Sequence, residues 1–68
     1  GNPFDQLSER ELQVLSALSG GKRVQEIAEQ LCLSPKTIST YRTRLLLKVG
    51  VDNDMALARL ALQFGVIS

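Results

Sequence analysis

The sequence predicts an all-α fold. Apolar residues recur at helical spacing along the chain, and no stretch keeps the strict alternation of a strand. Aromatic residues make up only 4% of the chain, whereas Leu, Ala and Ile are plentiful. At 68 residues the chain is long enough for one domain with a modest core, which must be built from nearby segments. We expect four helices, over residues of about 8–19, 24–31, 34–49 and 53–64.

The residues before the first helix have no periodicity. We expect residues 1–6 to be the end of a linker or a remnant of expression, and residues 7–68 to form the domain. Because the chain has no initiator methionine, we expect Gly1 and Asn2 to be such a remnant and the chain to be a piece of a longer protein. Phe4 and Leu7 are apolar, so we expect both to pack onto the helix that follows.

A capping box opens the first helix. Ser8 precedes Glu11 by three residues, so the hydroxyl can accept from the N3 amide while the carboxylate accepts from the cap amide. Two glycines, Gly20 and Gly21, end the helix. The apolar stripe between these signals is Leu12, Leu15 and Leu18, widened by Val14.

Two helices joined by a tight turn occupy the middle of the chain. Residues 24–31 carry apolar side chains at i, i+3, i+4 and i+7, the pattern of a short helix with one buried face. Only Cys32 and Leu33 separate this helix from Ser34, a good N-cap, and Pro35, which suits N1. A short helix, a tight turn and a longer capped helix form the helix-turn-helix arrangement, whose second helix reads DNA.

Cys32 is the only cysteine of the chain, so no internal disulfide can form. Because it stands between two leucines, we expect it to be a small buried side chain rather than a redox sensor.

The helix at 34–49 has two different sides. At about 100° per residue, the side formed by Ile38, Tyr41, Arg42, Leu45, Leu46 and Val49 faces the core. The opposite side carries Lys36, Ser39, Thr40, Thr43 and Leu47. No acidic residue lies between Gln30 and Val51, while four cations do: Lys36, Arg42, Arg44 and Lys48. Short polar side chains surrounded by cations suit the major groove of a duplex.

Arg42 differs from the other cations because it projects toward the core side. We expect its stem to pack and its guanidinium to pair with a carboxylate such as Glu11 or Glu26. A phosphate contact is the alternative.

The last helix is apolar on two sides. Gly50 ends the preceding helix, residues 52–54 can cap the next, and Gly65 stops it. A chain this small cannot cover both sides, which indicates self-association or a partner. The first stripe is Leu57, Leu60, Ala61 and Phe64, and the second is Met55, Ala58 and Leu62.

Several function classes find no support in the sequence. The chain has no histidine, no metal-spaced ligands and no nucleophile with a base nearby, so we expect no enzyme, metal or cofactor. Gly20-Gly21-Lys22 lacks the glycine spacing and the following Ser or Thr of a phosphate loop. No signal peptide or membrane-length apolar run is present, so we expect a cytoplasmic protein without membrane contact. The alternative to DNA binding is a protein-protein interaction module that uses the two-faced C-terminal helix.

Three runs resemble the C-terminal DNA-binding domain of LuxR-type transcription factors, as found in response regulators of two-component systems. They are Leu7-Ser8-x-Arg10-Glu11-x-x-Val14-Leu15, Glu26-Ile27-Ala28-x-x-Leu31, and Ser34-x-Lys36-Thr37-Ile38 with Lys48-x-Gly50-Val51. Within the family, the run LCLSPKTISTYRTRLL is similar to regulators of the GacA, UvrY and SirA type. Tyr41 and Leu47 depart from the residues that many members carry there.

The resemblance implies sequence-specific binding of double-stranded DNA and regulation of transcription. It implies that Ser39, Thr40 and Thr43 face base edges, and that Lys36, Thr37, Arg44 and Lys48 touch or approach phosphates. It also implies an upstream receiver domain and a homodimer contact through the last helix. The second apolar stripe predicts this contact at Met55, Ala58 and Leu62, and a two-fold pair of reader helices predicts an inverted-repeat promoter site. Because the base-facing side chains are short, water or DNA shape is expected to carry part of the specificity.

Overall fold

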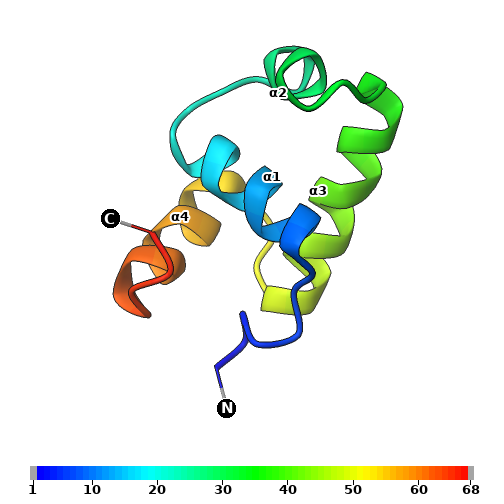
Figure 1. Cartoon of the computed structure of the whole chain (residues 1–68). Coiled ribbons are helices and arrows are strands. Elements are labelled where there is room, and N and C mark those ends of the chain that lie inside the picture. Colours follow the sequence, from blue (N-terminus) through cyan, green and yellow to red (C-terminus); the bar gives the residue numbers. More distant parts are fainter. Residues whose placement is uncertain (1, 68) are drawn as a thin grey trace.

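Four helices form the structure, a computed structural model that describes residues 2–67 (Figure 1). They are α1 (Glu9–Ser19), α2 (Val24–Leu31), α3 (Pro35–Val49) and α4 (Asp54–Gln63). All four predicted helices are confirmed, and most begin one residue later than predicted because the predicted ranges counted the N-cap. Gly1 and Ser68, which the predicted segments 1–6 and 7–68 include, lie outside the described residues.

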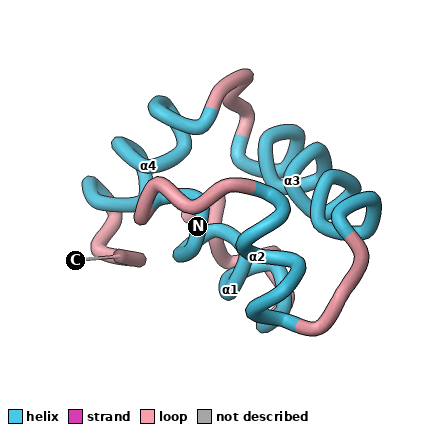
Figure 2. The backbone as a smooth tube through the Cα atoms, turned by 90° about the horizontal axis from the view of Figure 1, so that it is seen from above, coloured by secondary structure: helices cyan, strands magenta, loops and turns pink. Residues whose placement is uncertain are grey.

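Helix α1 is the central element. It packs against each of the other three helices, and α3 packs in addition against α2 and α4. Viewed from above, α3 and α4 lie on opposite flanks of the molecule and the segment before α1 passes between them (Figure 2). Each of these two helices therefore has one side on the core and one side turned away from it.

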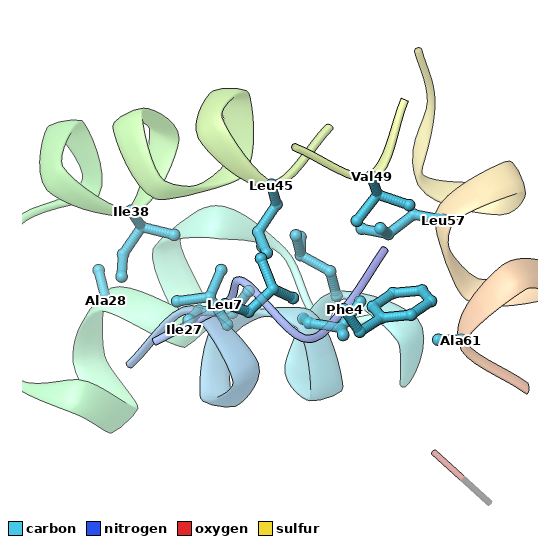
Figure 3. Close-up of a cluster of buried hydrophobic side chains, with 12 residues drawn as sticks. Phe4, Leu7, Ile27, Ala28, Ile38, Leu45, Val49, Leu57 and Ala61 are labelled. Atoms are coloured by element: carbon cyan, nitrogen blue, oxygen red, sulfur yellow. The ribbon is translucent and has the colours of Figure 1, made fainter. Parts of the chain in front are cut away.

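The core is one apolar cluster to which every helix contributes. In Figure 3, Ile38, Leu45 and Val49 descend from α3 toward residues of the N-terminal segment and of α2. Phe4 and Leu7 are buried, as the sequence predicted. Burying this cluster is the main stabilising contribution, at about 25 cal/mol per Å² of apolar surface. The buried residues are Phe4, Leu7, Val14, Leu15, Leu18, Ile27, Ala28, Ile38, Leu45, Val49, Leu57 and Ala61.

The buried stripe of α1 differs from the predicted one. Leu12 is 37% exposed, whereas Glu11 is only 4% exposed. Val14, Leu15 and Leu18 are buried as predicted, and Glu11 takes the place of Leu12, so the buried positions keep the i, i+3, i+4, i+7 spacing. The physical reason is that the Glu11 carboxylate has partners on the inner side of α1, described below.

The predicted helix ends are confirmed at the first and third helices. Ser8 Oγ accepts from the Glu11 amide at 3.1 Å, and Glu11 Oε1 accepts from the Ser8 amide at 2.8 Å. At the end of α3, Gly50 adopts φ 86°, a left-handed conformation that glycine takes without strain.

The expected burial of Cys32 is wrong. Cys32 is exposed and is the C-cap of α2, with φ 57° in the left-handed region. Its amide bonds back to the last turn of α2, as does the amide of Leu33, which donates to the Ala28 carbonyl at 2.9 Å. This geometry makes the turn between α2 and α3 tight, and it directs the cysteine away from the core.

Candidate nucleic-acid interface

The apolar side of α3 determines which of its residues face solvent. Ile38 and Leu45 are completely buried and point into the core (Figure 3). The opposite side of the helix is therefore open. Ser39, Thr40 and Thr43, the residues predicted to face bases, are all exposed on it.

The N-terminus of α3 is fixed by a local cap. Ser34 Oγ accepts from the Thr37 amide at 3.1 Å, and the two hydroxyl oxygens lie 2.8 Å apart. Pro35 occupies the first helical position, where its missing N–H costs nothing. Lys36 is exposed and Thr37 is half-buried beside the cap. Two predicted phosphate residues are thus held at the first turn of a helix, where the macrodipole favours anions.

The two threonines predicted to face bases bond to their own helix. Thr40 Oγ1 donates to the Lys36 carbonyl at 3.1 Å, and Thr43 Oγ1 donates to the Ser39 carbonyl at 3.0 Å. These bonds use the hydroxyl protons, so the oxygen lone pairs and the methyl groups are what the two side chains can still offer to a binding partner.

Six of the seven residues predicted to contact DNA gather on one side of α3. One shallow hollow is lined by Lys36, Ser39, Thr40, Thr43 and Arg44. A second is lined by Thr37, Thr40, Tyr41 and Arg44. Lys48 lines neither hollow.

Lys48 instead pairs with Glu11 of α1. Its Nζ lies 2.9 Å from Glu11 Oε1, an oxygen that also accepts from the Ser8 amide. The Ser8 amide, and after it the Lys48 ammonium, hold the pKa of Glu11 below its ordinary value, against the opposing effect of burial. The two residues are 37 apart in the chain, so no local pattern signals this pair. It attaches the last turn of α3 to the first turn of α1.

The predicted partner of Arg42 is wrong. Arg42 Nε lies 2.9 Å from Asp54 Oδ1 at the start of α4, and not beside Glu11 or Glu26. The Glu11 carboxylate is already paired with Lys48. Glu26 Oε1 accepts from the Arg23 amide at 2.9 Å and so caps the start of α2. The structural role expected of Arg42 remains, but it joins α3 to α4.

These pairs divide the cations of α3 into two kinds. Within residues 2–67, the ion pairs closer than 4 Å involve Arg42 and Lys48, so Lys36 and Arg44 are in none. Helix α3 itself contains no acidic residue. The uncompensated positive charge of α3 therefore belongs to residues that line the two hollows.

The outer side of α4 is apolar, as the sequence predicted. Met55 is 73% and Leu62 is 55% exposed, and Ala58 is partly exposed between them. Exposed Arg59 lies four residues after Met55 and three before Leu62, so the same side also carries a charge that the sequence analysis did not consider.

The predicted inner stripe of α4 is buried at its middle but not at its end. Leu57 and Ala61 are completely buried, whereas Phe64 is 45% exposed. The Phe64 ring still packs on Phe4, with ring centroids 5.9 Å apart. The end of the inner stripe thus packs on the N-terminal segment through Phe64.

Two kinds of feature are absent from residues 2–67. These residues contain no group of three or more His, Cys, Asp or Glu side chains placed to hold a metal ion. None of their helices is long and apolar enough to cross a membrane.

A family model described as "Bacterial regulatory proteins, luxR family" matches residues 5–61. The chain is similar to the response regulator GacA of Pseudomonas viridiflava, at 47% identity over 66 residues, and to that of Pseudomonas aeruginosa, at 46% identity over 66 residues. It is also similar to the response regulator UvrY of Escherichia coli strain K12, at 46% identity over 65 residues. These matches cover 96–97% of the chain but only 30–31% of each relative. The chain thus spans less than a third of the length of these relatives.

Proposed function

The chain belongs to the luxR family of bacterial regulatory proteins, and we propose that it is the DNA-binding output domain of a two-component response regulator that controls transcription. The observation that supports this most directly is the outer side of α3. It combines short polar side chains, two cations outside any ion pair among the described residues, and no carboxylate. An α-helix with such a side fits the major groove.

The proposed contacts follow the geometry of α3. Ser39, Thr40 and Thr43 would meet base edges, because they are exposed at the middle of the helix. The phosphate contacts would flank them, at Lys36, Thr37, Arg44 and Lys48. Lys48 would contribute least, because its charge is already compensated by Glu11.

The proposed DNA site is an inverted repeat bound by a homodimer. Met55, Ala58 and Leu62 would form the dimer contact, since they present an exposed apolar strip on a helix that α1 covers only from the other side. Two copies joined this way would place their α3 helices in successive major-groove turns.

The rest of the protein is inferred from the relatives. The GacA and UvrY proteins are named response regulators and are about three times as long as this chain, so a receiver domain would precede residues 7–68 and residues 1–6 would end the linker. The chain would act as a binding domain rather than an enzyme, without a cofactor, and in the cytoplasm, where the bacterial chromosome lies.

Duplex binding over a series of salt concentrations tests the proposal. Wild-type affinity should fall steeply as salt rises, and Arg44→Ala should reduce the slope of log affinity against log salt by about one unit on every duplex. Lys22→Ala is the matched control, because Lys22 is exposed but lies outside α3 and bonds to Gln30 at 2.8 Å. An affinity that does not respond to salt, or an equal effect of both variants, would contradict DNA binding by α3.

An interaction module is the second candidate, and the exposed Met55 and Leu62 side chains favour it. Leu62→Asp separates the two. If α4 forms the dimer, the variant should stay folded by circular dichroism and keep its affinity for a single half-site, but lose cooperative binding to the paired site. Undiminished cooperativity in the folded variant would remove the dimer role from α4.

A further inference from the structure

The outer side of α3 has a central row of four residues. Lys36, Thr40, Thr43 and Leu47 are spaced at i, i+4, i+7 and i+11, so their side chains lie nearly above one another along the helix. Ser39 and Arg44 flank this row. If α3 enters a groove with its outer side, the central row approaches the bases more closely than the flanks do.

Within the row, the threonines offer methyl groups and acceptors rather than donors. Both hydroxyl protons are used in bonds to backbone carbonyls one turn earlier, at 3.1 Å for Thr40 and 3.0 Å for Thr43. What each side chain still presents is a methyl group and the lone pairs of the hydroxyl oxygen. A donor bond to a base would first require breaking the bond within the helix.

Leu47 extends the row with a larger apolar group. Its side chain is 76% exposed, the most exposed large hydrophobic residue among the described ones. It also stands in a helix whose exposed neighbours are polar or charged, which makes it the exception on this surface. An apolar side chain at this place is stabilised if a partner removes it from water.

We propose that the central row of α3 reads thymine by its 5-methyl group, through the methyl groups of Thr40 and Thr43 and the side chain of Leu47. The inference rests on the proposed function and adds the chemistry of the base contact to it. Thymine carries the only methyl group in the major groove, and apolar contact with it distinguishes thymine from cytosine. The threonine oxygens would accept from the amino groups of adenine or cytosine beside it.

Replacement of thymine by deoxyuridine tests this directly, since it deletes the methyl group and leaves every hydrogen-bonding group of the base pair. The probe is a duplex enriched from a random pool by the wild-type chain, in which each thymine is replaced singly. Wild-type affinity should drop about fourfold at each thymine that the row contacts, the change that corresponds to roughly 0.8 kcal/mol for one buried methylene.

Paired variants identify the group responsible. Thr43→Ser removes the methyl group and keeps the hydroxyl, so it should bind the original duplex more weakly. At one thymine position, replacement by deoxyuridine should then cause no further loss of affinity, and this loss is the response compared below. Thr43→Val keeps a methyl group and removes the hydroxyl, so it should retain that response. The same pair is made at Thr40.

Leu47→Ala should abolish the response at a further thymine. Leu12→Ala is its control, because Leu12 is also an exposed leucine, 37% exposed, but lies on α1. If both alanine variants respond to deoxyuridine alike, Leu47 is not part of the reading row.

The inference is overturned if every deoxyuridine duplex binds as tightly as the original, or if both serine variants keep the full response and the valine variants lose affinity. The second result would mean that the hydroxyl groups, and not the methyl groups, make the contact with the base. Either result can occur in a chain that binds duplexes with steep salt dependence, so the proposed function would stand. Binding to no duplex at all would instead contradict the proposed function.

Discussion

Two ion pairs attach α3 to the rest of the domain, and they differ in how much of each lies in water. In the Glu11–Lys48 pair the carboxylate side chain is only 5% exposed and the ammonium side chain 38%. In the Arg42–Asp54 pair the two side chains are 35% and 44% exposed. Both distances are 2.9 Å. The two pairs therefore differ in burial and not in distance. Water screens the Arg42–Asp54 pair, whereas it cannot reach the Glu11 carboxylate to replace a lost Lys48 ammonium.

The largest effect is expected when the buried carboxylate loses its cation. Lys48→Met keeps the packed stem but leaves Glu11 charged and buried, and should lower the free energy of unfolding by about 2 kcal/mol, somewhat less than a fully buried pair because the ammonium is partly exposed. Urea unfolding followed by circular dichroism measures the change.

Glu11→Gln is the matched variant for this pair. The amide can still accept from the Ser8 amide in a capping box, and the released Lys48 can turn to solvent, so a cost of only about 1 kcal/mol is expected. Equal losses in both variants would mean that the pair behaves like an exposed one.

The pH dependence of stability is the next expectation. Since the pKa of Glu11 is lowered in the folded chain, mainly by the Ser8 amide, the unfolded chain binds the proton first as pH falls. The contribution of Glu11 is thus complete above the ordinary carboxyl range and is lost as pH falls through that range toward the folded pKa. Wild-type stability should decline more steeply with acid than that of Glu11→Gln. Parallel curves would contradict the lowered pKa.

Much of the fold could be predicted because its signals are local. The capping box at Ser8, the cap at Ser34 and the left-handed Gly50 each depend on residues within one turn of the chain, and all three are present. The two ion pairs could not be predicted in the same way. Glu11 and Lys48 stand 37 residues apart in the sequence. Several other carboxylates could have paired with Lys48 or with Arg42.

Two errors of prediction arise because burial was inferred from the apolar residues nearby in the sequence. Leu12 was expected in the core and is exposed, because the Glu11 carboxylate occupies the inner side of α1 with Ser8 and Lys48. Apolar spacing alone cannot reveal that a charged side chain has a buried partner. Cys32 was likewise assigned from its apolar neighbours, whereas its position is determined by the left-handed turn that ends α2.

A local cap should have an effect between those of the two ion pairs. Ser34→Ala removes the acceptor of the Thr37 amide at the start of α3 and should cost about 1 kcal/mol. Ser34→Asp restores an acceptor and is the control, with stability close to that of the wild type. An unchanged unfolding midpoint in the alanine variant would show that water replaces the cap without loss.

The smallest effect is expected for the exposed pair. Arg42→Ala removes the contact with Asp54, but Asp54 then remains 44% exposed or more and lies in the first turn of α4, where its charge is still stabilised by the helix dipole. We therefore expect a loss of about 0.5 kcal/mol that shrinks as salt is added. Lys48→Met provides the reference, because its larger loss arises where screening is weak and should change little with salt. If Arg42→Ala cost as much as Lys48→Met and resisted salt, the packed stem of Arg42 rather than its charge would join α3 to α4, and burial of the charged atoms would not be what distinguishes the two attachments.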